Sequence, residues 1–315
     1  MTTTHLKNPK ITLIGAGGFV FPFRLLGDIL SFPALRESTL TLMDVNPDKL
    51  GPVASATREL VAHHGFGATV EETTDRRAAL DGADIVIITF QVGGVESYRH
   101  DVEIPRKYGI DQTVGDTVGP GGVFRFLRSV AAYDEIAADA LEVCPDATFI
   151  NYANHMAMAT AYLNAKGLRT VGLCHSVQGT TRMLARTLEI PYDEISYRCA
   201  GINHQAWLLK IEDLCGNDLY PEIKRRAASP DYNKEGNDLV RLKMMQEFGY
   251  YITESSEHTS EYTPWFIKEK YPELIDRYKI PLDEYPRRCV NQINGWNEMR
   301  DSLLKDSHIE HKKTH

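Results

Sequence analysis

Long apolar runs, a cysteine framework and an excess of basic charge are all missing from this sequence. No apolar run approaches the roughly 18 residues that a membrane-spanning helix needs, and the N-terminus, MTTTHLKNPK, has no apolar core like that of a signal peptide. The five cysteines are odd in number and lack framework spacing, which predicts a reducing, cytoplasmic location without a disulfide scaffold. The net charge of −8 argues against a general nucleic-acid binder.

The 315 residues, 43% of them hydrophobic and 25% charged, are enough for one large domain or two. Short β-branched runs alternate with amphipathic segments, which predicts an α/β fold with a Rossmann-like, doubly wound parallel sheet. We expect strands at residues 11–14, 40–43, 83–90, 147–150 and 170–173, and helices at residues 23–30, 52–64, 123–143 and 156–163.

The pattern changes after about residue 200, where strands of similar quality become rare. Residues 239–248 and 281–297 have helical spacing. We therefore expect a Rossmann-like domain over residues 1–198 and a second, α+β domain over residues 199–315.

A glycine-rich turn follows the first expected strand. Gly15, Gly17 and Gly18 lie in this turn, and Asp44 ends the second strand. Glycines let the backbone approach a pyrophosphate at a helix N-terminus, and an acid at this place can bind the ribose hydroxyls of NAD. The third glycine position of the fingerprint is Val20, so the match is partial and a tight strand-to-helix turn is the alternative.

Two short segments contain both a cysteine and a histidine. Cys174 and His175 follow the last expected strand, and Cys199 precedes His204 by five residues. Thiolate and imidazole suit a borderline transition metal, with substrate and water completing the shell. A buried, inert cysteine is the alternative for Cys174. A nucleophilic pair of Cys174 with His175 is poorer, because adjacent side chains of a strand point to opposite faces.

Three further polar clusters stand out: GDTVGPGG at 115–122, NYANH at 151–155, and residues 254–265, which hold five ionisable groups in twelve positions. The first is a glycine-rich loop before a helix, and the second ends a strand of the expected sheet. A solvated surface loop is the alternative for the third.

Taken together, six motifs resemble glycoside hydrolase family 4, in particular its α-galactosidase (melibiase) branch. They are GAGG at 15–18, GDTVGPGG at 115–122, NYANHMAM at 151–158, GLCHSVQG at 172–179, CAGINH at 199–204 and TESSEHTSEYTPWF at 253–266. The resemblance covers essentially the whole chain. It implies a NAD- and metal-dependent glycosidase, the exception to two-carboxylate hydrolysis.

The resemblance also implies a reaction sequence and its cofactors. NAD oxidises the sugar at C3, a base removes the C2 proton, the glycosidic oxygen is eliminated, water adds, and the hydride returns. A divalent metal, commonly Mn²⁺, stabilises the charge that develops on the sugar oxygens. The implied substrate is an unphosphorylated α-galactoside; α-glucosides and α-galacturonides are the alternatives within the family.

The same resemblance assigns roles to individual residues. It places the metal ligands on Cys174 and His204, and a substrate-binding asparagine on Asn154. The C2 base falls on Tyr262, with a neighbouring Asp or Glu as the alternative. The phenol needs a nearby metal or cation to act as a base near neutral pH. The remaining catalytic candidates are His175, which occupies the position of an acidic residue in some branches, and Asp116.

Three further expectations follow from the family. The chain has Asn154-His155 where the family usually has Asn-Pro, which predicts a looser Asn154. Members are typically longer, so the second domain is expected to be incomplete. They are usually dimers or tetramers, so we expect a homo-oligomer without nucleic-acid or membrane partners. A simple NAD-dependent dehydrogenase and an inactive NAD-binding remnant are the rival interpretations.

Overall fold

The structure is a computed structural model that describes residues 7–18, 21–229, 238–282 and 284–305. The chain divides into two compact units. The first unit contains residues 1–94, 126–173 and 288–315, and the second contains residues 95–125 and 174–287. Because both units combine separate stretches of the chain, they do not follow one cut in the sequence. The division at residue 198 stays a prediction.

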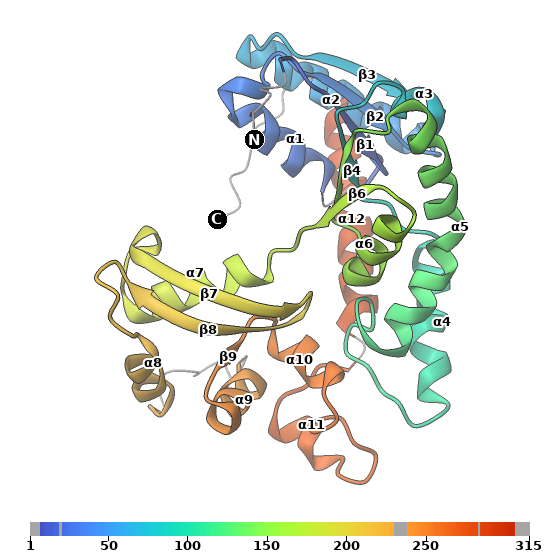
Figure 1. Cartoon of the computed structure of the whole chain (residues 1–315). Helices are drawn as coiled ribbons and strands as arrows, with labels where there is room; N and C mark the ends of the chain where they lie inside the picture. The colour runs from blue at the N-terminus through green and yellow to red at the C-terminus, as the bar shows by residue number, and fades with distance from the viewer. Residues whose placement is uncertain (1–6, 19–20, 230–237, 283, 306–315) are drawn as a thin grey trace. The chain divides into compact units, whose positions relative to one another are not determined.

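A six-stranded parallel sheet forms the centre of the first unit (Figure 1), which confirms the predicted fold class. The strand order is β3-β2-β1-β4-β5-β6. The bounds are β1 Lys10–Ile14, β2 Thr39–Met43, β3 Thr69–Thr73, β4 Ile85–Ile88, β5 Thr148–Asn151 and β6 Arg169–Gly172. The order reverses between β1 and β4, which is where sheets of this kind bind ligands.

Alternate side chains of the strands pack into separate cores on the two faces of this sheet. Ile11 and Leu13 pack with α1 (Pro22–Ser31) and α2 (Pro47–His64). Ile14 faces the other core, to which α3 (Arg76–Leu80), α5 (Gly119–Val143) and α6 (Met156–Ala165) contribute. Both faces of the central strands are therefore buried, as their near-continuous apolar sequences predict.

The predicted elements of this unit are confirmed in kind, but several bounds differ and two elements were missed. Strand β4 is Ile85–Ile88 rather than 83–90, α5 begins at Gly119 rather than residue 123, and the short helix α3 was not predicted. Strand β3 was not predicted, because its polar sequence TVEET lies exposed or half-buried at the edge of the sheet. Helix α2 begins at Pro47 rather than residue 52, because the Asn46 side chain accepts hydrogen bonds from the N–H groups of Asp48 and Lys49. Pro52 lies inside this helix.

The second unit contains a three-stranded antiparallel sheet in the order β7-β8-β9. The bounds are β7 Ile195–Ile202, β8 Gln205–Asp213 and β9 Tyr251–Ile252. The long β7–β8 hairpin contradicts the expectation that strands become rare after residue 200. Its sequences do not alternate cleanly between polar and apolar, so period-2 patterning was not visible.

Helices complete the second unit. They are α4 (Gly94–Arg106), α7 (Ser176–Leu188), α8 (Tyr220–Ala227), α9 (Leu239–Phe248), α10 (Ser256–Tyr262) and α11 (Glu273–Arg277). Helix α9 has the predicted bounds, and α12 (Glu284–Lys305) begins later and ends later than predicted, with residues in both units. Short 3-10 turns lie at Pro33–Leu35 and Tyr192–Glu194.

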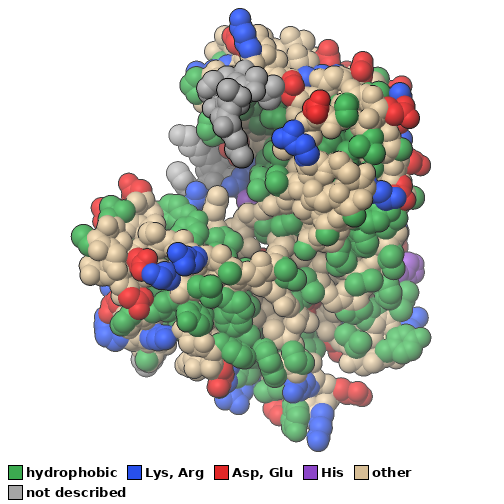
Figure 2. Space-filling view, viewed as in Figure 1, with side chains coloured by type: hydrophobic (Ala, Val, Ile, Leu, Met, Phe, Trp, Pro, Cys, Tyr) green, Lys and Arg blue, Asp and Glu red, His purple; other side chains and the backbone are tan. Residues whose placement is uncertain are grey.

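Charged side chains of both signs are scattered among apolar ones over the face that Figure 2 shows. Of the helices formed by the described residues, none combines the length and apolar character needed to cross a membrane.

Candidate active site

The glycine turn after β1 has a geometry that requires glycine at its first position. Gly15 has a φ of +90°, and its N–H donates to the carbonyl of Met43, at the end of β2, over 2.9 Å. A Cβ atom on Gly15 would lie 2.6 Å from the backbone nitrogen of Phe90, which follows β4. The turn therefore lies against the residues that follow β2 and β4, beside the reversal of strand order.

Asp44 is tied to this turn through its carboxylate. Oδ2 accepts the N–H of Gly17 over 2.9 Å, and Oδ1 accepts the N–H of Asn46 over 2.9 Å. The N–H of Gly18 donates to the carbonyl of Gly15 over 3.2 Å. The predicted cofactor residues Gly15, Gly17, Gly18 and Asp44 thus lie together; Val20 is outside the described residues.

The start of α1, which follows this turn, is suited to an anion. Among the residues that the structure describes here, no side chain caps the helix, and the first turn of the helix contains no acidic residue. A dinucleotide pyrophosphate at this place would face the positive end of the helix dipole without a competing carboxylate. The glycine turn, the helix start and Asp44 therefore fit NAD.

Asn154 lies between β5 and α6, also in the first unit. The preceding turn is fixed by Asn151, whose side-chain oxygen accepts the N–H of Ala153 over 3.1 Å. His155, in place of the expected proline, is 1% exposed and contacts the rings of Phe126 and Tyr133 edge-on. A proline would restrict this turn through its fixed φ, whereas His155 restricts it through side-chain packing. This packing opposes the predicted loosening of Asn154.

The second unit brings together a thiol, an imidazole and a carboxylate. The Sγ of Cys174 lies 3.4 Å from the Nε2 of His204, and this Nε2 lies 3.3 Å from the Oε2 of Glu254. The three ligand atoms lie within 4.8 Å of one another. First-row metal bonds of about 2.0–2.3 Å place neighbouring ligand atoms roughly 3–4 Å apart, so this donor set fits a transition metal.

His204 is held in an uncommon backbone conformation. It lies in the two-residue turn that joins β7 and β8, with a φ of +62°, and is 5% exposed. A non-glycine residue costs energy in the left-handed region, and such strain is often found at functional sites. The turn directs the imidazole toward residues from three other segments.

The thiol of Cys174 has a perturbed acidity. Burial alone would raise its pKa, but the hydrogen bond from His204 and the charge of that imidazole lower the pKa of Cys174 to about 7. A thiolate, which is the form that binds metals, is therefore accessible near neutral pH.

His175 does not share this environment. It is exposed and occupies the N-cap position of α7. Strand β6 ends at Gly172, so the alternation of side chains along a strand does not apply to Cys174 and His175, and that argument for separating them was wrong. They differ instead in burial, since Cys174 is half-buried and contacts His204.

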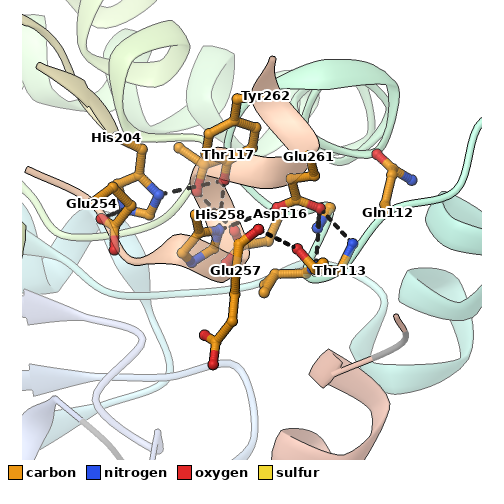
Figure 3. Close-up of polar contacts among 12 residues, drawn as sticks. Gln112, Thr113, Asp116, Thr117, His204, Glu254, Glu257, His258, Glu261 and Tyr262 are labelled. Atoms are coloured by element: carbon orange, nitrogen blue, oxygen red, sulfur yellow. Dashed lines mark hydrogen bonds and ion pairs between the residues drawn. The ribbon is translucent and has the colours of Figure 1, made fainter. Parts of the chain in front are cut away.

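A second cluster adjoins the first through His204 (Figure 3). Ligand atoms of Asp116, His204 and His258 lie within 4.8 Å of one another. The hydroxyl of Tyr262 lies 2.8 Å from the Nδ1 of His258 and 3.4 Å from the Nδ1 of His204. Tyr262, the predicted base, and Asp116 therefore lie beside the candidate metal ligand.

Charge within this cluster is strongly coupled. Burial would raise the pKa of Asp116, but the positive charges of His258, Arg125 and His204 lower that pKa to about 2. Burial would lower the pKa of His258, but its hydrogen bond to Glu261 and the charge of Asp116 raise that pKa to about 9. The two groups hold each other in the charged form near neutral pH.

Tyr262 is held in the neutral form. Its pKa is raised well above 10 by burial first and then by the carboxylates of Glu261 and Asp116. The phenol would therefore need a nearby cation to lose its proton near neutral pH.

Sequence reasoning assigned no individual role to four polar residues in or near these clusters, Gln112, Glu254, His258 and Glu261, beyond allowing a neighbouring Asp or Glu to replace Tyr262 as the base. The dense ionisable run at 254–265 was a signal for the last three. A solvated surface loop was the alternative for this run. The structure instead places part of the run in helix α10, where Ser256, His258, Thr259 and Ser260 are buried. Gln112 had no signal in the sequence.

The fold and these clusters define an α/β protein of the dinucleotide-binding class that also carries a set of transition-metal donors. The chain belongs to family 4 of the glycosyl hydrolases: the family model matches residues 10–190, and the model of the family's C-terminal domain matches residues 199–314. This confirms the resemblance seen in the motifs.

Relatives with known names agree with this membership. An α-galactosidase from Bacillus subtilis (strain 168) is 47% identical over 307 residues, which are 97% of this chain and 71% of the relative. An α-galactosidase from Rhizobium meliloti (strain 1021) is 39% identical over 85% of this chain and 55% of its own length. The chain thus spans between about half and three quarters of the length of these two relatives.

A solved structure shows the same fold. It is the 6-phospho-α-glucosidase from gut microorganisms in complex with NAD and Mn²⁺, with a TM-score of 0.74 and 21% identity. The alignment covers 95% of this chain and 68% of that chain.

Proposed function

We propose that this chain is an α-galactosidase that uses NAD and a divalent metal, with Mn²⁺ the first candidate. The observation that carries the proposal is the thiol, imidazole and carboxylate of Cys174, His204 and Glu254, which present three metal-ligand atoms in one place. A simple dehydrogenase has no use for such a set. The 47% identity to an α-galactosidase supports the sugar class.

When bound, NAD would accept and return a hydride at the sugar, and the metal ion would act as a Lewis acid toward sugar oxygens. In the first unit, Gly15, Gly17 and Gly18 would let the backbone approach the pyrophosphate, and Asp44 would orient the ribose. Asn154 would bind the substrate. These assignments give the dinucleotide fold a role in a hydrolase.

In the second unit, Cys174, His204 and Glu254 would hold the metal. Tyr262 would remove the C2 proton. Its hydroxyl lies 3.4 Å from the Nδ1 of His204, whose Nε2 faces the Cys174 thiol. An ion on Nε2 would make the opposite ring N–H a stronger donor to the phenol oxygen, which lowers the cost of the phenolate.

Asp116 and His175 have different chemical capacities. A carboxyl group with a pKa of about 2 is ionised at neutral pH, so Asp116 fits proton acceptance or charge support. His175 is exposed and can exchange protons with water, which fits a leaving-group acid.

The proposal extends to the setting of the enzyme. Cys144, Cys174, Cys199 and Cys215 form no disulfide, which supports the proposed reducing, cytoplasmic location. The two family models meet between residues 190 and 199, which supports a domain division near residue 198. We propose a homo-oligomer, a dimer or a tetramer, which sedimentation velocity would test.

Hydrolysis of p-nitrophenyl α-galactoside in D₂O, with NAD, Mn²⁺ and a thiol reductant, tests the reaction. Loss and return of the C2 proton would place deuterium at C2 of the released galactose, whereas two-carboxylate hydrolysis leaves C2 untouched. A parallel panel of α-glucoside, α-galacturonide and 6-phospho-α-glucoside tests the sugar. Faster turnover of another member would overturn the sugar assignment, and steady accumulation of NADH would favour a dehydrogenase.

A further inference from the structure

Glu261, in helix α10, makes an unusual set of contacts for a single carboxylate (Figure 3). Its side chain is 1% exposed. Its Oε2 accepts three consecutive backbone N–H groups, from Thr113, Val114 and Gly115, over 2.8, 2.9 and 2.9 Å. Its Oε1 lies 3.1 Å from the Nδ1 of His258. Four donors from two segments of the second unit therefore converge on this group.

These contacts connect segments that are 146 to 148 residues apart in the sequence. A second bond supports the same junction, because the hydroxyl of Thr113 donates to the carbonyl of Glu257 over 3.0 Å. Successive backbone N–H groups that point at one oxygen form an anion-binding concavity, and hydrogen bonds to an ionised acceptor are stronger than neutral ones. The residues 113–115 form such a concavity here, filled by the chain's own carboxylate.

The loop is also held from its other side. The amide of Gln112 donates to the carbonyl of Asp101 over 3.0 Å, and its oxygen accepts the N–H of Gly121 over 3.1 Å. A Cβ atom on Gly121 would lie 2.3 Å from the carbonyl oxygen of Gly115, so the start of α5 packs directly on the loop. Residues 113–115 are therefore held on one side by Gln112 and the start of α5, and on the other side by Glu261. We call this arrangement the Glu261 clamp.

Both segments that Glu261 joins carry residues of the candidate site. Asp116 follows Gly115 and accepts the hydroxyl of Thr117 over 2.8 Å. On the helix side, His258 lies one turn before Glu261, and Tyr262 is the next residue. The one carboxylate therefore joins the segment that carries Asp116 to the helix that carries His258 and Tyr262.

We propose that Glu261 is a positioning residue that locks the loop 113–115 to helix α10 and thereby aligns Asp116 with His258 and Tyr262. It acts through the backbone N–H groups and the imidazole, not on the sugar. The kinetic part of this inference rests on the proposed function, while the clamp itself does not.

The test is Glu261→Gln in the full chain. The glutamine side chain has nearly the same shape, but its NH₂ group must face either the three backbone N–H groups or the imidazole, where two donors would meet. We expect amide hydrogen exchange at residues 113–115 to quicken roughly tenfold or more, as the loop opens locally. Displacement of the aligned groups should lower kcat on the order of 100-fold. KM for the p-nitrophenyl galactoside and the Kd for Mn²⁺ should change less than about threefold, since neither the metal donors nor the sugar contact Glu261 in this proposal.

Two further variants keep the test decisive. Glu261→Asp retains the charge but is one methylene shorter, so it should recover part of the exchange protection and part of kcat. Glu247→Gln removes an exposed carboxylate of α9, which pairs with Lys243 alone within the part of the chain that the structure describes. This variant should leave every readout unchanged.

The outcomes separate the clamp from the reaction. Fast exchange at residues 113–115 in the unmodified chain, or unchanged exchange there in a folded Glu261→Gln protein, would overturn the inference. If Glu261→Gln does not fold, the exchange of the unmodified chain and the graded response of Glu261→Asp decide. If the unmodified chain cleaves no galactoside while Glu261→Gln loosens the loop, the proposed function fails and the clamp stands.

Discussion

The thiol of Cys174 lies 3.4 Å from the Nε2 of His204, thirty residues further along the chain. The first follows strand β6 and the second lies in the turn between β7 and β8, so the pair exists only in the folded second unit. The sequence neighbour of the thiol, His175, is exposed instead. The chemistry of Cys174 is therefore set by His204 and Glu254, which leads to the first prediction.

Replacing Cys174 with serine should weaken Mn²⁺ binding on the order of 100-fold or more, because a neutral hydroxyl replaces a thiolate ligand. The free Mn²⁺ signal in electron paramagnetic resonance measures this directly, without any need for turnover. Cys215→Ser is the matched control, since Cys215 is exposed and free. An unchanged Kd in Cys174→Ser would remove Cys174 from the metal site.

The alkylation rates of Cys174 and Cys144 should depend differently on pH. With a pKa of about 7, Cys174 in the metal-free protein should be mostly thiol at pH 6 and mostly thiolate at pH 8, so its alkylation rate should rise through this range. Burial raises the pKa of Cys144 to about 11, so Cys144 should stay unreactive at both values. Iodoacetamide labelling followed by peptide mass spectrometry resolves the two sites.

Bound Mn²⁺ should protect Cys174 from the same reagent, because the metal and the alkylating agent compete for the thiolate. An alkylation profile for Cys174 that rises only above pH 9 would contradict the proposed influence of His204 on its pKa.

The backbone conformation of His204 predicts that glycine is more stabilising than alanine at this position, the reverse of the usual order. Since φ is +62° there, His204→Gly should be more stable than His204→Ala by about 1 kcal/mol, although glycine is normally the costlier residue. Both variants lose the imidazole, so the difference isolates the strain of the turn. Urea unfolding followed by circular dichroism measures it, and greater stability of the alanine variant would mean that the turn relaxes out of the left-handed region.

The sequence was most informative where one local rule determines the structure. The strands at 11–14 and 40–43 follow from buried apolar runs, and Gly15 and Asp44 follow from the requirements of a strand-to-helix turn. Edge strand β3 could not be found in this way, because its exposed sequence TVEET has no apolar face.

The candidate site depended more on tertiary contacts than on local pattern. Cys174 and His204 could be assigned through the family motifs, but Glu254 and His258 lay in a run whose alternative was a solvated loop. Glu261 needed knowledge of the loop 113–115, more than 140 residues away in the sequence. The hydrophobic periodicity of a sequence carries no information about a carboxylate that binds backbone N–H groups so far away along the chain.

A buried ion pair beside the first residue of α10 gives the last prediction. The guanidinium of Arg241, which is 9% exposed, donates to Asp238, to the hydroxyl of Thr180 over 2.8 Å, and lies over the ring of Tyr251. Asp238 in turn accepts the hydroxyls of Tyr251 and Ser256. Because Ser256 begins α10, this network fixes the start of the helix that carries His258, Glu261 and Tyr262.

Arg241→Met should therefore lower the free energy of unfolding by about 3–5 kcal/mol, because it leaves the Asp238 carboxylate buried without its cation. The double variant Arg241→Met/Asp238→Leu should recover part of this loss, since it removes the uncompensated charge at the expense of the Tyr251 and Ser256 hydrogen bonds. Lys243→Met, on the same helix, removes an exposed cation that pairs with Glu247, and should cost less than about 1 kcal/mol. Urea unfolding of the four proteins gives the comparison. If Arg241→Met costs no more than Lys243→Met, the pair does not hold α10, and the alignment of the site must come from the Glu261 clamp alone.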